Sequence, residues 1–516
     1  MVRRSRPAWL AVLVALTAVG CSAGHSTSSS NSTSPPPPQR GQLLSPAAKV
    51  ASYGTSDLLT LLGLDPLGQL LLTLHISPGC TVTVYHIEYE TVGGRSEATT
   101  ASGALMVPSG SHSFCQGPRP IVEYAHGTSA DKSYDITKLT GSSEGLILAA
   151  VFASEGYIVV APNYAGYDTS TLGYHPYLVG AQQADDMIDA LAAARSALPV
   201  ADAPGVTDDH KLYITGYSQG GYVAMATHRA LQAAGQTVTA SAPMSGPYTL
   251  GAFGDALFLG QVNGSATVNF AILANAYQNA YGNLYSDPSE VFATPYASSV
   301  PGLLPSATAL SMLYSENLLP QNALFSSTPP APQYASITPA TMPANLAVVF
   351  ALGFGSNFLL SNAYRLSYLQ DQQANPDGGL PTVTDGLPAA SPGNALRQDL
   401  RQNDLRAWSP SAPVLLCGGD EDPVVFFFNT QLMQSYWTSH PPPGTVSVLD
   451  VDSAATANDP YADEKTGFAA ARAAVEASAI AGGATDGGHA AVLESYHAPL
   501  VPPFCLAAAK VFFDSH

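Results

Sequence analysis

Charged side chains are scarce in this chain: only 11% of its 516 residues are Asp, Glu, Lys or Arg. Acidic residues number 38 and basic residues 19, which gives a formal net charge of −19. The composition argues against a nucleic-acid partner, because phosphate binding needs clustered Lys and Arg. Long apolar runs are also missing beyond the N-terminus, since Gly, Pro or polar residues interrupt each one. No membrane-spanning helix is therefore expected in the body of the chain.

The N-terminus has the features of an export signal. Three arginines precede an apolar segment, residues 8–19, which is too short to span a bilayer comfortably, and small residues then lead to Cys21. The pattern resembles a bacterial lipobox, in which Cys21 is lipidated, although Ala18 stands where leucine is usual; secretory cleavage nearby is the alternative. We expect a signal peptide over 1–20, a Ser- and Pro-rich tether over 21–45, and a secreted protein or a lipoprotein of the cell envelope, anchored to the membrane by that lipid.

Cysteine is rare, with five residues in all, and four remain if Cys21 carries lipid. An even number in an exported protein suggests disulfides, for which the sequence allows three pairings. We favour Cys80–Cys115 and Cys417–Cys505, because each pair lies within one half of the folded domain; buried free thiols are the alternative. No His or Cys pair has metal-ligand spacing in a short window, and no Gly-rich phosphate loop occurs. No metal and no cofactor are expected.

Strand and helix patterns alternate in the first half of the chain, which predicts an α/β fold with a mostly parallel sheet covered by helices on both faces. The expected strands are 81–89, 104–108, 120–125, 157–162, 211–215 and 238–243, and the expected helices are 179–198 and 222–231. The first of these strands alternates with period two for much of its length, as an edge strand does.

The alternation stops at residue 250 and resumes near residue 409. Helical stretches punctuated by Pro and Gly fill the interval, at 268–281, 310–319, 346–360 and 396–408. We expect a helical cap over 250–408, inserted between two parts of one sheet domain, 46–249 and 409–516; a separate structural domain is the alternative. The second part has expected strands at 413–417 and 445–450, an Ala-rich helical insertion over 454–485, and helices at 424–440 and 504–513.

The most informative motif is Gly-Tyr-Ser-Gln-Gly-Gly at 216–221, which follows an apolar strand and precedes a helix. A Gly-x-Ser-x-Gly sequence in this context is typical of a sharp strand-to-helix turn that lifts a nucleophilic serine out of the sheet. Glycines are needed because the backbone is strained there and its neighbours pack closely. Ser218 is the expected nucleophile; a glycine-rich turn with a surface serine is the alternative.

A nucleophilic serine needs a base, and the base needs an acid to orient it. Three carboxylates, Asp420, Glu421 and Asp422, follow the strand that ends at residue 417, and an acidic turn without catalytic function or a calcium loop is the alternative there. The expected base is His489, which follows two glycines, as a loop that delivers an imidazole does. His497 is its rival.

Developing negative charge on the substrate also needs N–H donors. The expected donors are the backbone N–H groups of Gln219, the residue after the nucleophile, and of Thr128, in the His-Gly-Thr segment after the strand 120–125. His126 in that segment is expected to be structural. Asn163, after the strand 157–162, lines the pocket or caps its loop, and the sequence does not choose between these.

Four segments together resemble the α/β-hydrolase superfamily, and look closest to secretory lipases of the fungal lipase A type and their bacterial relatives. They are His-Gly-Thr at 126–128, Gly-Tyr-Ile-Val-Val-Ala-Pro-Asn-Tyr-Ala-Gly at 156–166, the serine motif at 216–221, and Asp422 before Pro-Val-Val. The resemblance covers about 80–250 and 410–510. It implies ester hydrolysis, Asp422 as the acid, disulfides, and a helical cap between the sixth and seventh core strands. The insertion at 454–485 and an asparagine at 163, where such enzymes often have aspartate, depart from the pattern.

The leading hypothesis is a serine hydrolase that cleaves carboxylic esters through an acyl-enzyme, like triacylglycerol lipases. Its substrate is then a small-molecule ester or a lipid with a medium or long acyl chain. A serine peptidase or an acyltransferase with the same triad is the second hypothesis. A non-catalytic surface lipoprotein is the third, and a Ser218→Ala variant with full biological effect would favour it.

Overall fold

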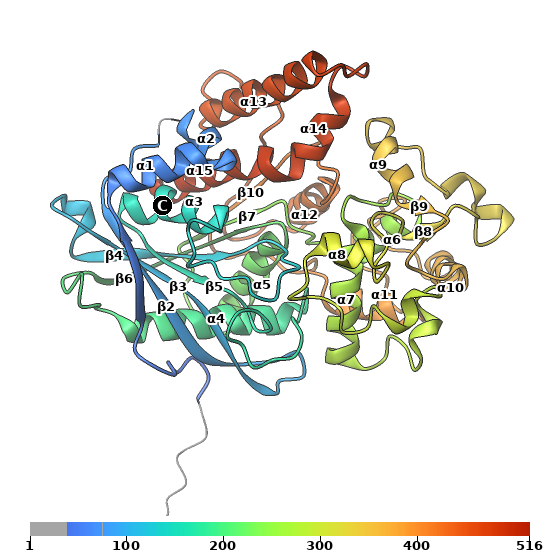
Figure 1. Ribbon diagram of the computed structural model, residues 1–516, viewed down its shortest axis with the longest axis horizontal. Coiled ribbons are helices and arrows are strands. Elements are labelled where there is room, and N and C mark those ends of the chain that lie inside the picture. The colour runs from blue at the N-terminus through green and yellow to red at the C-terminus, as the bar shows by residue number, and fades with distance from the viewer. Residues whose placement is uncertain (1–38, 75) are drawn as a thin grey trace, which may run out of the picture. The chain divides into compact units, whose positions relative to one another are not determined.

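A nine-stranded sheet forms the centre of the protein (Figure 1). The computed structural model describes residues 39–74 and 76–516, so the predicted signal peptide, Cys21 and most of the tether lie outside the described residues. The strands are β1 (Ala48–Tyr53), β2 (Thr81–Val92), β3 (Ala98–Ser109), β4 (Pro118–Ala125), β5 (Ile158–Pro162), β6 (Thr207–Tyr217), β7 (Ala240–Met244), β10 (Val414–Gly418) and β11 (Val446–Asp450).

The strands lie in the order β1-β2-β3-β5-β4-β6-β7-β10-β11. The pairs from β1 to β5 are antiparallel, and every pair from β5 onward is parallel. This topology confirms the predicted mostly parallel α/β sheet. The expectation that the segment 81–89 is an edge strand is wrong, because β1 pairs along its outer side. Most side chains of β1 are exposed, so its sequence lacks the apolar alternation that marks a strand.

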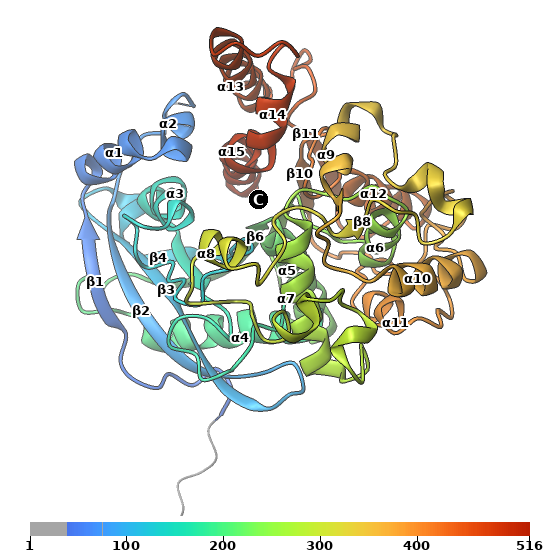
Figure 2. The same ribbon diagram turned by 45° about the vertical axis from the view of Figure 1, so that its right-hand side comes forward.

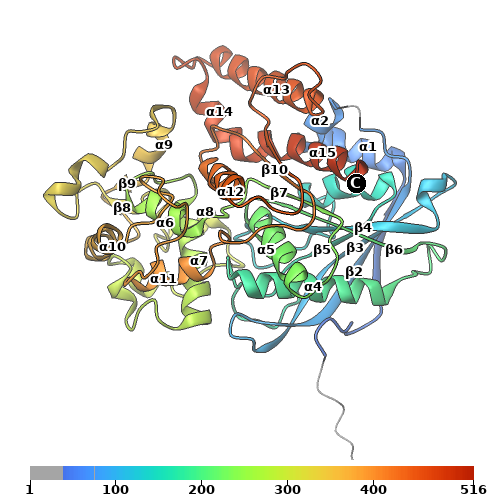
Figure 3. The same ribbon diagram turned by 180° about the vertical axis from the view of Figure 1, so that it is seen from behind.

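Helices cover both faces of the sheet, as the view from behind also shows (Figures 1 and 3). On one face lie α4 (Gly180–Ala197) and α5 (Gln219–Ala233). On the other lie α1 (Thr55–Leu64), α2 (Pro66–Leu72), α3 (Ser143–Val151) and α15 (Val501–Asp514). Each layer packs its own apolar core onto the sheet, so the strands between them are buried on both sides and the loops at their carboxyl ends are held on a rigid base.

The chain leaves the sheet after β7 and returns to it at β10, and most of the regular structure in the segment between is helical (Figure 2). Its helices are α6 (Leu250–Phe258), α7 (Ala266–Tyr281), α8 (Leu310–Ser315), α9 (Ala347–Leu352), α10 (Asn362–Ala374) and α11 (Ala395–Gln402), and β8 (Phe325–Ser326) and β9 (Phe354–Gly355) form a small separate sheet. The predicted single helix over 346–360 is wrong, since α9 ends at Leu352 and β9 follows. Two glycines, Gly353 and Gly355, interrupt the apolar run there and weaken a helix.

The chain after β10 forms α12 (Phe428–Ser439), α13 (Ala462–Ala481) and α14 (His489–Ser495), and a π-turn over Tyr496–Leu500 precedes α15. Short 3-10 helices elsewhere cover Ser113–Cys115, Ala153–Glu155, Pro288–Glu290, Tyr296–Ser298, Pro332–Ile337 and Ala344–Leu346. Within the described residues, no helix is both long and apolar enough to cross a bilayer.

Both predicted disulfides are confirmed. Cys80 and Cys115 join the start of β2 to the turn before β4, and Cys417 and Cys505 join β10 to α15. All four cysteines are fully buried. The second disulfide ties the strand that leads to Asp422 to the C-terminal helix.

Candidate active site

Ser218 lies in a sharp turn between β6 and α5, with φ 60° and ψ −121°. A non-glycine residue at positive φ is strained, and close neighbours must hold it there. The flanking glycines allow neighbouring backbone to approach the turn closely. A Cβ at Gly216 would overlap the Gly220 carbonyl oxygen, and a Cβ at Gly220 would overlap that of Ala125. The structure therefore gives the sequence motif the backbone geometry that the chemistry requires.

Ser218, His497 and Asp422 form one chain of hydrogen bonds. The Ser218 Oγ lies 2.9 Å from His497 Nε2, and His497 Nδ1 lies 2.7 Å from Asp422 Oδ2. Because a carboxylate only accepts, the Nδ1–H donates to Asp422 and leaves Nε2 free to accept the serine proton. Asp422 is almost completely buried, and its other oxygen accepts the N–H groups of Val424 and Val425 at 2.9 Å each. Its orientation is thus fixed from both sides.

The predicted pairing of His489 with Ser218 is wrong. His489 is the first residue of α14, and its Nε2 lies 2.9 Å from the Asn345 carbonyl oxygen in the inserted segment. Gly487 and Gly488 have positive φ and form the turn that starts this helix. His497 instead occupies the turn immediately before the C-terminal helix, a position that Pro499 and Pro502 mark in the sequence because proline favours helix starts.

The two predicted N–H donors come from two different segments near Ser218. Gln219 is the first residue of α5, so its N–H has no partner within the helix. Thr128 lies in the loop after β4; among residues 39–74 and 76–516 no acceptor bonds to its N–H, and its hydroxyl lies 2.9 Å from the Tyr177 hydroxyl. Both residues line the spaces next to Ser218. The arrangement suits the stabilisation of an oxyanion.

Glu144 holds the loop of Thr128 in place, a contact that no motif in the sequence predicts. Its carboxylate accepts the Gly127 N–H at 3.0 Å, the Tyr124 hydroxyl at 2.8 Å and the Tyr134 hydroxyl at 3.2 Å. These three donors fix the carboxylate, and through Gly127 they fix the backbone next to Thr128. The expected donor is therefore pre-positioned by a side chain from α3.

His175 holds the side chain of Gln219. It is fully buried, and burial lowers the pKa of its imidazole to about 3, so the ring is neutral. Its Nδ1–H donates to the Ala165 carbonyl oxygen, which leaves Nε2 to accept from Gln219 Nε2 at 2.7 Å. Neutral His175 therefore anchors the side chain of Gln219 at the start of α5 without placing a positive charge there.

Two other residues that the sequence analysis named, His126 and Asn163, are buried and support neighbouring loops. The ring of His126 is buried and stacks between Tyr134 and Tyr164, with ring centroids 4.3 and 4.2 Å away. Asn163 is also buried, and its Oδ1 accepts the Ile136 N–H at 2.9 Å. Asn163 therefore fixes a neighbouring loop and does not line the spaces next to Ser218.

Two cavities meet at Ser218. One is an apolar space of about 70 Å³ between the serine and helices α6 and α7, lined by Leu250, Phe253, Leu257, Phe258, Phe270 and Leu273 among others. The other measures about 490 Å³ and has polar groups in its wall, among them Thr128, Glu144, Tyr217, Tyr314 and His497. Both cavities have mostly apolar walls, and the larger one also presents polar groups beside Ser218.

Comparisons with known proteins find a lipase family and an esterase. A model of the secretory lipase family matches residues 132–252. The rice cell wall degrading esterase LipA from Xanthomonas oryzae is 28% identical in one structure, covering 80% of this chain and 91% of that one with a TM-score of 0.61. A ligand-bound form is 26% identical over 92% of this chain and 98% of that one, with a TM-score of 0.64.

A Legionella pneumophila protein described as a hydrolase has 18% identity, covers 92% of this chain and 98% of its own, and gives a TM-score of 0.61, which supports the fold alone. No curated protein matches significantly. The fold predicted from the sequence is confirmed. The match to a secretory family, together with the two disulfides, indicates an exported protein.

Proposed function

We infer that Ser218 is the nucleophile of this α/β hydrolase, a carboxylic ester hydrolase that resembles the secretory lipases. The observation that supports this role is the continuous hydrogen-bond chain from Ser218 through His497 to Asp422. In the proposed reaction, Ser218 attacks the ester carbonyl while His497 takes its proton, and Asp422 stabilises the imidazolium that forms. The N–H groups of Gln219 and Thr128 bind the oxyanion.

The proposed intermediate is an acyl-enzyme. Collapse of the first tetrahedral species breaks the carbon–oxygen bond of the ester, and His497 returns its proton to the departing alcohol. A water then attacks the acyl group on Ser218, with His497 again as the base, and the acid leaves. Each proton removed by His497 is returned to a leaving oxygen, so the enzyme ends in its starting state.

The shape of the cavities suggests which ester fits. We assign the acyl chain to the apolar cavity beneath α6 and α7, and the alcohol to the larger cavity, whose wall has more polar groups. The apolar cavity is much smaller than the other one, about 70 Å³ against about 490 Å³, so we expect it to take a short or medium acyl chain. We therefore propose a short or medium acyl chain, where the sequence analysis favoured a medium or long one.

Hydrolysis of p-nitrophenyl esters from acetate to palmitate by the mature protein tests the proposal. We expect an optimum at short or medium chains and a loss of at least about 10³-fold in kcat for Ser218→Ala, since removal of a triad serine abolishes most catalysis. Equal turnover by both proteins would show that another group performs the chemistry. An optimum at palmitate would overturn the assignment of the acyl cavity.

We further propose that Cys21 carries lipid and anchors the protein to a membrane. The support is the lipobox-like sequence alone, because Cys21 lies outside the described residues. Metabolic labelling with a radioactive fatty acid should mark the wild-type protein and not a Cys21→Ala variant; labelling of both would remove the anchor from the proposal.

A further inference from the structure

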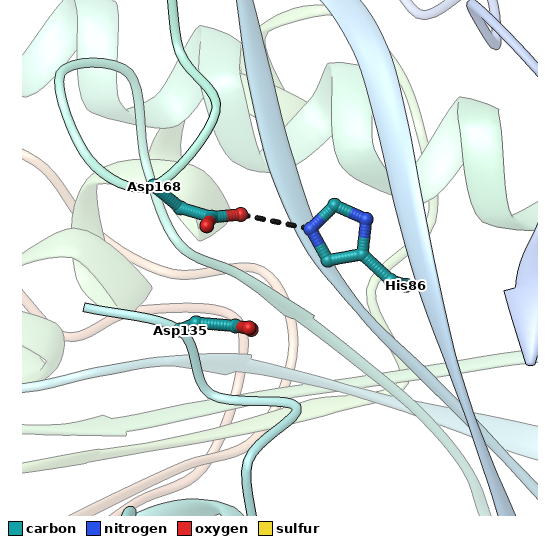
Figure 4. A group of neighbouring side chains, drawn as sticks. All are labelled: His86, Asp135 and Asp168. Carbon is teal, nitrogen blue, oxygen red and sulfur yellow. Dashed lines mark hydrogen bonds and ion pairs between the residues drawn. The ribbon is translucent and has the colours of Figure 1, made fainter. Parts of the chain in front are cut away.

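Three potential metal ligands that do not belong to the Ser218 hydrogen-bond chain lie together: His86, Asp135 and Asp168 (Figure 4). His86 comes from β2, Asp135 from the loop after β4, and Asp168 from the loop after β5. His86 Nε2 lies 2.8 Å from Asp168 Oδ2, and one ligand atom from each residue lies within 4.8 Å of the other two. Figure 4 shows both carboxylates directed toward the imidazole.

We propose that His86, Asp135 and Asp168 bind one divalent transition-metal ion of the Zn²⁺ type. Ligand atoms that share a zinc ion at about 2.0–2.2 Å lie about 3–4 Å from one another, so small side-chain movements bring this group to bonding distance. Two carboxylates balance the charge of the ion. One imidazole favours Zn²⁺ over Ca²⁺ and Mg²⁺, which prefer oxygen ligands. Water completes the coordination.

The two carboxylates are already oriented by their neighbours. Asp135 Oδ1 accepts the N–H and the hydroxyl of Thr137, at 3.0 and 2.7 Å, and this leaves Oδ2 toward the cluster. The Ser102 hydroxyl donates to Asp168 Oδ2 at 2.6 Å. Lys138 Nζ lies 3.3 Å from Asp135 Oδ2, but its side chain is 63% exposed, so the ammonium can return to water when an ion binds. Such supporting hydrogen bonds are typical of metal sites.

Asn163 links the loop that carries Asp135 to Ser102, the residue that bonds to Asp168. Its Nδ2–H donates to the Ser102 hydroxyl at 3.0 Å, and its Oδ1 accepts the Ile136 N–H at 2.9 Å, next to Asp135. One buried amide therefore links the residues that orient both carboxylates. An ion here would tie together the loop that carries Thr128 and the loop that carries His175, so its role would be structural and coupled to stability.

The test is zinc binding to the mature, tag-free protein after chelator treatment and dialysis. We expect one Zn²⁺ per chain by titration calorimetry and elemental analysis, and no measurable heat with Ca²⁺ or Mg²⁺. His86→Ala and Asp135→Asn should each weaken binding at least about 100-fold, and Ser102→Ala about tenfold. With Zn²⁺ at 100 times its Kd, Tm should rise by about 3 °C in the wild type and not in His86→Ala.

The matched control is His210→Ala. His210 also lies beside an aspartate, with its Nδ1 3.8 Å from Asp208 Oδ2, but it is exposed and belongs to no such cluster. This variant should bind Zn²⁺ like the wild type. Circular dichroism establishes that each variant is folded. The proposal fails if folded wild type binds no Zn²⁺ at millimolar concentration, which would leave a plain His86–Asp168 ion pair. It also fails if His86→Ala binds as tightly as wild type, or if Ca²⁺ is the ion that binds.

Discussion

At the scale of single residues, the site depends on which histidine reaches Ser218. His489 and His497 are eight positions apart in the chain, yet one bonds to a carbonyl in the inserted segment and the other to the serine and Asp422. The glycines before His489 suggest a loop, but they form the start of a helix. Local sequence could not distinguish the two, because the distance to Ser218 is set by how α15 packs on the sheet and how α14 packs on α13.

Alanine substitutions separate the two histidines. His497→Ala should lower kcat for p-nitrophenyl butyrate by at least about 10³-fold, because it removes the proposed base. His489→Ala should change kcat less than about threefold, since it removes only the hydrogen bond to the Asn345 carbonyl oxygen. Comparable losses in both, with intact far-ultraviolet circular dichroism, would contradict the assignment.

At the scale of elements, α6 and α7 of the inserted segment form the apolar wall beside Ser218. An ion pair fixes α6: Asp255 and Arg397 of α11 lie 2.9 Å apart and are buried. The helical character of this segment followed from its apolar stretches. Its contribution to the cavity did not, because the pattern of one helix does not say which neighbour its apolar face will meet.

A bulky residue on α6 should shorten the preferred acyl chain. Leu257 is part of the cavity wall, and Leu257→Trp should lower kcat/KM for the octanoate relative to the acetate ester roughly tenfold, the loss of about two buried methylenes.

Leu259→Trp is the control for that variant. Leu259 has similar partial exposure at the end of the same helix and does not line the cavity. It should keep the wild-type ratio of octanoate to acetate turnover. An unchanged ratio in both variants would mean that the acyl chain lies elsewhere.

At the scale of the whole molecule, the interior of the folded protein contains carboxyl groups whose pKa is raised by burial. Glu123 on β4 is fully buried, and within the described part of the chain neither of its oxygens has a hydrogen-bond partner. Burial raises the pKa of Glu123 from 4.5 to about 8, although Arg195 opposes the shift. Burial likewise raises the pKa of Asp186 from 3.8 to about 7. Both groups bind a proton more tightly in the folded than in the unfolded state.

The free energy of unfolding should therefore fall as pH rises. The stability that Glu123 contributes as a neutral acid is present in full below pH 4.5 and is lost progressively up to about pH 8, where the buried group must ionise. A shift of this size corresponds to roughly 5 kcal/mol. Glu123→Gln should match wild type near pH 5 and be more stable by about that amount at pH 8.5, in urea unfolding at both pH values. Equal pH dependence in the two proteins would show that Glu123 does not titrate in this range.

The sequence by itself determined the α/β fold and the serine turn, and it favoured, among three pairings, the disulfides that the structure contains. The fold and the turn follow from local patterns: apolar strands that alternate with helices, and the glycines around Ser218. Only the tertiary structure decided which histidine meets the serine, how Glu144 and His175 hold the N–H donors, and that His86, Asp135 and Asp168 lie together. The physical reason is that contacts between distant segments depend on strand order and on helix packing, which no short stretch of sequence encodes.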